Sequence, residues 1–343
     1  MWDDFIARQI RRTNRNLFLL GTVLVAIIGT ILGIERRAAY NFVLGPFPIQ
    51  ASELSGIWNP DVPKRYFLKV QGEKSIPTGT QEVDQNDHSH VRAEVVALVV
   101  GKRLLLVKTP KDNRQLQFAG AIVPIPAEVQ SGVVRDTEAK YPQMKGVFLP
   151  YMLDATGFRD RDSIFAAIAV AVFGGLGLLL MGISIFRQSN PDKHPLLAKL
   201  QRYGQVQDIR MQIDSELRSE GGGERFGALR FTTNWVIQAL AYQTNVMQVR
   251  EVLWAFPKVT KHYHNGIPTG KTYSATLRDS CGQSLEVSGK KDTVPVLLQT
   301  LQRRMPWILV GYSKELDALW QKEKPKFFQL MEKRRAELSM APR

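Results

Sequence analysis

The sequence has few cysteines and lacks the familiar catalytic spacings. Cys281 is the only cysteine in 343 residues, so an intramolecular disulfide cannot form. No HExxH, CxxC or GxSxG motif is present, and no GxxxxGK[ST] follows the glycine run 221–223. We therefore expect no catalytic residues, no cofactor and no metal, and an enzyme is the less favoured class.

Acidic residues are also scarce relative to basic ones. The chain has 46 Lys and Arg against 32 Asp and Glu, and 25 basic against 15 acidic residues follow position 186. Positive charge beside a bilayer is typical of the cytoplasmic side and favours anionic headgroups. Nucleic acid is the competing partner, but no zinc-finger spacing or RNA-binding signature supports it, and we expect none.

Two long apolar runs stand out, Leu17–Ile34 and Ile164–Phe186, and neither contains a charged residue. A run of about 20 apolar residues matches the thickness of the hydrocarbon layer. The first run also has the pattern of a signal peptide. Its length and the Glu35–Arg37 segment in place of a small-residue cleavage site favour an uncleaved anchor.

The residues that flank the two runs predict the topology. More Lys and Arg precede the first run than follow it, and more follow the second run than precede it, which places both termini in the cytoplasm of a cell with an inner membrane. The predicted order is a cytoplasmic segment 1–16, a transmembrane helix 17–34, an extracytoplasmic β-rich domain 35–162, a second helix 163–186, a cytoplasmic linker and helical segment 187–223, and a cytoplasmic α+β domain 224–343.

Small residues recur along both predicted helices at spacings that let backbones approach closely, within one chain or between copies. The predicted packing positions are Gly29, Gly33, Ala167, Ala171 and Gly175. The alternative is that Gly and Ala are simply common in such helices.

The segment between the helices predicts a small mixed β domain, a barrel or a sandwich. After an irregular lead-in over 37–60, strands are expected in 65–72, 90–100, 102–110 and 115–126, with a hairpin at Gly101, a helix after Pro126 and a final strand near 145–155. The run 84–90 contains Asp84, Asp87, His88 and His90, which we interpret as a solvated loop rather than a metal site.

The C-terminal part predicts two helices interrupted near Gly204, a series of strands from Arg225 to Gly289, an amphipathic helix over 293–305 and a charged helix from 314 to 338 broken by Pro325. Its four tryptophans are expected in the core: Trp235, Trp254, Trp307 and Trp320. Cys281 is expected in a turn rather than paired with a histidine as a nucleophile, and His262 and His264 as solvated positions on one strand face.

Basic residues on or beside these strands form a candidate surface for anionic lipid or a protein partner. They are Lys258, Lys261, Lys271, Lys290, Lys291, Arg303 and Arg304. Each contributes about 1 kcal/mol beside an anionic leaflet. A solvated face that aids solubility is the alternative.

The segments HPLLAKLQRYG, RFGALRFTTNWVI, VLWAF, RRMPWILVGYS and ELDALW resemble a group of uncharacterised bacterial two-span membrane proteins with an extracytoplasmic β domain. The resemblance covers most of the chain and implies no activity. The strands closed by a helix also resemble a pleckstrin-homology-like domain in pattern, without a phosphoinositide-binding motif that matches residue by residue.

The sequence thus leads to a hypothesis rather than an activity. We expect a non-catalytic scaffold or sensor in the membrane that binds protein partners, a second copy of itself or anionic lipid. A subunit of a membrane enzyme complex is the alternative, while a lone transporter is disfavoured because neither apolar run contains an ionisable residue.

Overall fold

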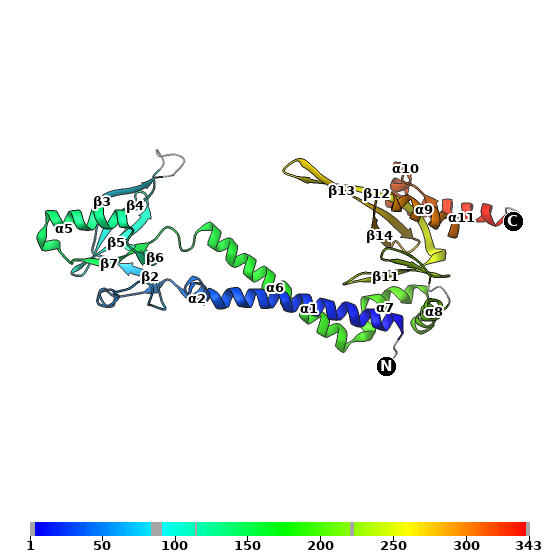
Figure 1. Cartoon of the computed structure of the whole chain (residues 1–343), viewed down its shortest axis with the longest axis horizontal. Coiled ribbons are helices and arrows are strands. Elements are labelled where there is room, and N and C mark those ends of the chain that lie inside the picture. The colour runs from blue at the N-terminus through cyan, green and yellow to red at the C-terminus, as the bar shows by residue number, and fades with distance from the viewer. Residues whose placement is uncertain (1–3, 84–90, 114, 220–222, 341–343) are drawn as a thin grey trace. The chain divides into compact units, whose positions relative to one another are not determined.

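The computed structural model in Figure 1 describes residues 4–83, 91–113, 115–219 and 223–340. It divides into two compact units. The central unit comprises residues 23–177, and the C-terminal unit comprises residues 1–22 together with 178–343. The predicted ligand candidates His88 and His90, with Asp84 and Asp87, lie outside the described residues.

Both apolar runs lie in long helices. Helix α1 extends over Phe5–Ile34 and helix α6 over Arg161–Ser189. Only 6% of the most apolar 18-residue window of each helix is buried. A core helix of a soluble protein would be mostly buried. These two helices instead expose a large apolar surface, which is typical of a surface that contacts a membrane or another protein. They are long and apolar enough to cross a membrane.

The three glycines among the predicted packing positions make no close contact with another segment of the same chain. An added Cβ at Gly29, Gly33 or Gly175 would meet no atom within 4 Å. A Cβ on Gly174 of α6 would lie 3.4 Å from the Ile28 side chain, and Gly21 and Gly177 are buried. Ala167 is half-buried and Ala171 is exposed. Packing between copies through the predicted positions stays a prediction.

The central unit is built on one seven-stranded sheet in the order β1-β2-β6-β7-β5-β4-β3. The pairs β1–β2 and β5–β7 are parallel and the others are antiparallel. The strands are β1 Phe47–Pro48, β2 Phe67–Gln71, β3 Lys74–Val83, β4 Val91–Val100, β5 Arg103–Pro110, β6 Gln117–Pro124 and β7 Phe148–Asp154.

Both faces of this sheet are covered, which is why it does not form the predicted barrel or sandwich. Strand β4 is buried at successive positions from Val95 to Leu98, so its two faces both need apolar contacts. One face packs against the helical segment after β6, through Val129, Val133 and Val134. The other face packs against Leu54 and its neighbours. The helical segments of the unit are α2 Arg36–Leu44, α3 Ala51–Leu54, α4 Ala127–Val129, the π-helical η1 Gln130–Arg135, α5 Asp136–Lys140 and η2 Pro142–Met144.

Most predicted elements of this unit are confirmed, with two corrections. The hairpin turn at Gly101 has the positive φ of 61° that favours glycine. The lead-in predicted as irregular contains helix α2. Strand β3 was not predicted because it contains Pro77 and Gly79; it lies at the sheet edge, where the ladder tolerates proline and is interrupted between Pro77 and Gln81.

Gly120 in β6 offers a test of this packing. A Cβ there would lie 2.4 Å from the backbone oxygen of Asp154 in β7. We expect Gly120→Ala to destabilise the sheet by about 2 kcal/mol, seen as faster amide hydrogen exchange in β6 and β7 of the full chain. Gly132→Ala is the matched control, since a Cβ there meets nothing within 4 Å. Equal exchange in the two variants would contradict the packing.

The C-terminal unit contains two four-stranded sheets, ordered β11-β10-β9-β8 and β14-β13-β12-β15. All pairs are antiparallel except the parallel β12–β15. The strands are β8 Glu224–Phe226, β9 Leu229–Phe231, β10 Trp235–Ala239, β11 Thr244–Gln248, β12 Val252–His264, β13 Ile267–Asp279, β14 Ser284–Gly289 and β15 Leu309–Val310.

Helices cover these sheets. The apolar face of α9 supplies Val294, Leu297, Leu298 and Leu301 to a core shared with both sheets. On β12, Trp254 packs instead against side chains of the last two helices. The helical segments are η3 Pro191–Lys193, α7 Pro195–Leu200, η4 Gln201–Tyr203, α8 Val206–Arg218, η5 Val249–Glu251, α9 Thr293–Arg304, α10 Lys314–Lys322 and α11 Lys324–Met340.

The prediction of core tryptophans holds for Trp235, Trp254 and Trp320, which are 0%, 0% and 7% exposed, while Trp307 is half-buried. The predicted helix interruptions near Gly204 and before Pro325 are present as well. Two interruptions of the predicted strand series are corrections. Gly227 lies in the turn between the antiparallel strands β8 and β9, and the chain bends at η5, where it passes from the first sheet to the second.

Candidate functional site

The first turns of α1 are part of the core of the C-terminal unit. Ile6 is fully buried in a cluster that also contains residues of α7, α8 and β10. The other buried members of this cluster are Leu196, Leu197, Leu200, Ile209, Ile213, Trp235, Ile237 and Val246. Ile10 packs against the same cluster one turn later. Helix α1 therefore belongs to this domain before its apolar run begins at Leu17.

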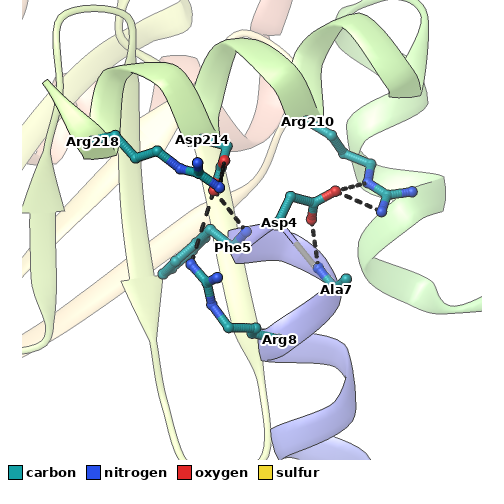
Figure 2. Close-up of polar contacts among 7 residues, drawn as sticks. All are labelled: Asp4, Phe5, Ala7, Arg8, Arg210, Asp214 and Arg218. Carbon is teal, nitrogen blue, oxygen red and sulfur yellow. Dashed lines mark hydrogen bonds and ion pairs between the residues drawn. The ribbon is translucent and has the colours of Figure 1, made fainter. Parts of the chain in front are cut away.

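Asp4 attaches the start of α1 to α8, as Figure 2 shows. Its Oδ1 accepts a hydrogen bond from the Ala7 amide at 2.8 Å, which caps the helix. Its Oδ2 accepts from Nε and Nη2 of Arg210 at 3.0 and 2.7 Å. The two side chains are only 15% and 12% exposed. Because both side chains are largely buried, loss of either partner would leave the other charge buried without a counterion, which is strongly destabilising.

Asp214, one turn further along α8, makes a second set of contacts (Figure 2). Its Oδ1 accepts from the backbone amide of Phe5 at 3.0 Å and lies 3.9 Å from Nη2 of Arg8. Its Oδ2 pairs with Arg218 at 2.7 Å. Two carboxylates, one from each helix, thus bind the N-terminus of α1 to α8.

The end of α6 is attached through α7. His194 caps α7, since its Nδ1 accepts from the Leu196 amide at 3.2 Å. Burial, with a smaller contribution from Arg187, lowers the pKa of His194 to about 4. The imidazole is 6% exposed, and its Nε2 has no hydrogen-bond partner among the described residues. His194 is therefore held neutral.

Two further contacts fix the helix ends beside each other and beside the domain. The Ser184 hydroxyl donates to the backbone oxygen of Asn14 at 2.9 Å. The side-chain amide of Asn16 donates through Nδ2 to the backbone oxygen of Ala241 at 2.8 Å. The β10–β11 turn therefore lies next to the residue where the apolar run of α1 begins.

Sequence reasoning missed this junction. Residues 1–16 were expected only as a cytoplasmic segment, although Asp4 is a good N-cap residue and Ile6 and Ile10 are one turn apart. Those signals predict a helix start with an apolar face. The partners Arg210 and Asp214 carry no signal of their own, since they are ordinary charged residues on an amphipathic helix.

The predicted basic residues lie on the outer half of the β12–β13 hairpin and at the two ends of α9. Lys258, Lys261 and Lys271 lie on the outer half of the β12–β13 hairpin. Every residue of 257–264 and 267–272 is exposed there, and Figure 1 shows this ribbon extending beyond the rest of its sheet. Lys261 and Lys271 lie directly opposite each other in the register, whereas Lys258 is paired with Glu286 at 2.8 Å.

The other four residues lie at the two ends of α9. Lys290 and Lys291 precede the helix, and Arg303 and Arg304 end it. Twelve helical residues separate the ends by about 18 Å. Arg304 is paired with Glu224 at 3.3 Å. The length of α9 thus separates Arg303 and Arg304 from Lys290 and Lys291. Lys290 follows Gly289, which pairs with Tyr273 two positions from Lys271.

The histidine and cysteine candidates are also apart. His262 Nε2 lies 2.7 Å from the Thr272 hydroxyl on the exposed ribbon, and His264 ends β12. Cys281 is exposed in the turn that follows β13. The strand runs for about ten residues, or roughly 30 Å, from Gly270, which pairs with His262, to its end at Asp279. Within the part of the chain that the structure describes, no group of three or more His, Cys, Asp and Glu is placed to hold a metal ion.

One part of the chain is similar to a described domain family. Residues 204–320 match the model of a domain family described as a domain of unknown function, DUF6709. The matched region, about a third of the chain, begins just before α8 and ends in α10. It contains Arg210 and Asp214 but not α1, so the contacts at Asp4 and Phe5 join this domain to a helix outside the match. No curated protein and no solved structure matches the chain.

Proposed function

We propose that the protein is a two-pass membrane protein of a bacterial inner membrane, with both termini and the C-terminal unit in the cytoplasm and the central unit on the outer side. It acts there as a non-catalytic scaffold or sensor. Three observations support this proposal: two exposed apolar helices, the arrangement of basic residues around them, and the junction between α1 and the C-terminal unit.

The junction carries the proposal. Helix α1 continues without a break from its buried first turn at Ile6 to Ile34, so its apolar run is a direct extension of a helix anchored in the domain core. A flexible tether would suffice to hold a domain at a membrane. A continuous helix fixed by Asp4 and Asp214 instead transmits a tilt or displacement to α8, which suits a sensor or a scaffold with a defined orientation.

The surface near the start of the apolar run supports a membrane-facing orientation. The β10–β11 turn beside Asn16 exposes Leu240 and Tyr242, which are 39% and 50% exposed. Aromatic and apolar side chains of this kind are enriched at the headgroup level. Arg15 and Arg187 lie close to the run ends, as cytoplasmic flanking residues do.

The fold of the C-terminal unit supports a pleckstrin-homology-like architecture as part of the proposal. Two sheets are followed by α9, whose apolar face closes their shared core. The exposed ribbon, with its opposed Lys261 and Lys271, is the surface we propose for a protein partner. Directly opposed like charges destabilise a strand pair, and an acidic partner would relieve that repulsion.

The topology can be tested with the single native cysteine. In right-side-out membrane vesicles, a membrane-impermeant maleimide should leave Cys281 unlabelled, although its side chain is exposed. In a Cys281→Ser background, the same reagent should label Gln143→Cys, an exposed position of the central unit. Both cysteines should react after detergent solubilisation. Labelling of Cys281 in intact vesicles, or release of the chain by alkaline carbonate, would overturn the proposal.

The scaffold role has its own readout. Cross-linking in intact cells, followed by purification of the full chain, should recover a stable protein neighbour or a second copy, and Lys261→Glu with Lys271→Glu should reduce that recovery. Recovery of the chain alone under every condition would rule out the scaffold. Separately, an intact mass that lacks residues 1–34 would show that the first helix is a cleaved signal sequence.

A further inference from the structure

A cavity of about 580 Å³ lies between the first turns of α1 and the last turns of α6, within the C-terminal unit. Its walls come mainly from these two helices and from the short segment that follows α6. The volume falls in the range of small-molecule binding sites. The Ser184–Asn14 hydrogen bond joins the two helices at the wall of this cavity, so its sides are held at a fixed spacing.

The cavity is lined by cationic side chains. Arg11 and Arg15 are one turn apart on α1, and Arg187 faces them from α6. Arg210 also lines the wall and is paired with Asp4. Among the lining residues that the structure describes, Asp192 supplies a carboxylate. Guanidinium groups bind phosphate through paired N–H donors, so this arrangement suits a phosphate with a net negative charge.

The same cavity has an apolar side. Ala7, Ile10 and Leu197 line its wall, and Phe18 lines it where the apolar run of α1 begins. Phe18 is 36% exposed and leads to the exposed apolar surface of the helix. A small soluble anion would make no favourable contact with that apolar surface. A ligand with a phosphate at one end and hydrocarbon at the other would satisfy both halves.

We propose that an anionic phospholipid of the cytoplasmic leaflet binds in this cavity, with its phosphate among Arg11, Arg15 and Arg187 and its acyl chains along the apolar run of α1. The inference rests on the membrane insertion of the proposed function. Basic pockets between membrane helices on the cytoplasmic side are suited to such headgroups. The site is separate from the ribbon and from the ends of α9. Because the cavity adjoins the α1 junction, the bound lipid holds α1 and α6 together where they enter the domain.

The test uses the full chain in neutral detergent and native mass spectrometry with added dioleoylphosphatidylglycerol or dioleoylphosphatidylcholine. One phosphatidylglycerol per chain should bind at least about tenfold more tightly than phosphatidylcholine. Arg15→Gln with Arg187→Gln should weaken phosphatidylglycerol binding by about thirtyfold, since each basic residue beside an anionic headgroup contributes roughly fivefold. Phosphatidylcholine binding should not change.

The matched control is Arg12→Gln with Lys193→Gln, which removes the same charge from exposed positions on α1 and beside α6 that do not line the cavity. It should change phosphatidylglycerol binding by less than about twofold. An equal loss in both double variants would overturn the site, as would equal binding of the two lipids by the unaltered chain. Displacement of the lipid by millimolar glycerol 3-phosphate would assign the cavity to a soluble phosphate instead.

The two proposals fail separately. A chain that alkaline carbonate releases from membranes contradicts the membrane topology. A chain that stays in the membrane but does not prefer phosphatidylglycerol contradicts only the lipid site.

Discussion

Replacing Asp4 with alanine should loosen the attachment of the N-terminus of α1 to the C-terminal unit. The change removes the cap on the Ala7 amide and leaves the Arg210 guanidinium, which is 12% exposed, without its carboxylate. Together these losses should cost about 3 kcal/mol, of which the cap accounts for about 1 kcal/mol. Amide hydrogen exchange in the first turns of α1 and in α8 should rise by roughly a hundredfold in the full chain.

Two further variants separate the cap from the charge. Asp4→Asn keeps a good N-cap but loses the ion pair, so it should show only about 2 kcal/mol of the effect. In Arg210→Gln, the additional change Asp4→Ala should cost about 1 kcal/mol, because the charge pair is already gone. Equal effects of Asp4→Ala in both backgrounds would mean that Asp4 and Arg210 do not act together.

The junction attaches the start of α1 and the end of α6 to the same domain. Helix α1 contributes Ile6 to the core of the domain and then continues into the apolar run, while α6 is connected through the capped helix α7. Both connections end on the same apolar cluster. A signal that moves either helix therefore reaches the same set of residues in α7, α8 and β10.

Local patterns were sufficient to predict most elements but not their assembly. Apolar runs, glycine turns and helix stops depend on neighbours in sequence, so the apolar part of α1, α6, the Gly101 hairpin and the helix break near Pro325 were predictable. Strand β3 was missed because its position at the sheet edge, and not its composition, permits Pro77. The bend at η5 was missed because the switch between sheets is a tertiary event.

The candidate site shows the same limit more clearly. The seven basic residues looked like one surface because they lie on neighbouring predicted elements, but the length of α9 separates two groups and Glu224 and Glu286 pair with two of the members. In contrast, Arg11 and Arg187 are 176 positions apart and share a cavity. Charge counts near predicted spans located the basic flanks, yet only the fold brings their side chains together.

The second large effect concerns pH and His194. The pKa of this imidazole falls from an ordinary 6.5 to about 4 in the folded chain, mainly through burial and further through Arg187. Between these values the unfolded chain binds a proton that the folded chain does not. The free energy of unfolding therefore keeps its full value above pH 6.5. It falls as the pH falls toward 4, by up to about 3 kcal/mol. Protonation also removes the Nδ1 acceptor that caps α7.

We expect the free energy of unfolding of the C-terminal unit, followed by tryptophan fluorescence of the full chain in detergent, to drop by 2 to 3 kcal/mol (about the full linkage value) from pH 7 to pH 4.5. In His194→Asn the cap is kept and the titrating group is gone, so the drop should be much smaller. Asp279, whose pKa burial raises, opposes this trend but is present in both chains and cancels in the comparison. Identical pH profiles for the two chains would show that His194 is not the group that titrates, and the attachment of α6 would then not be sensitive to acid.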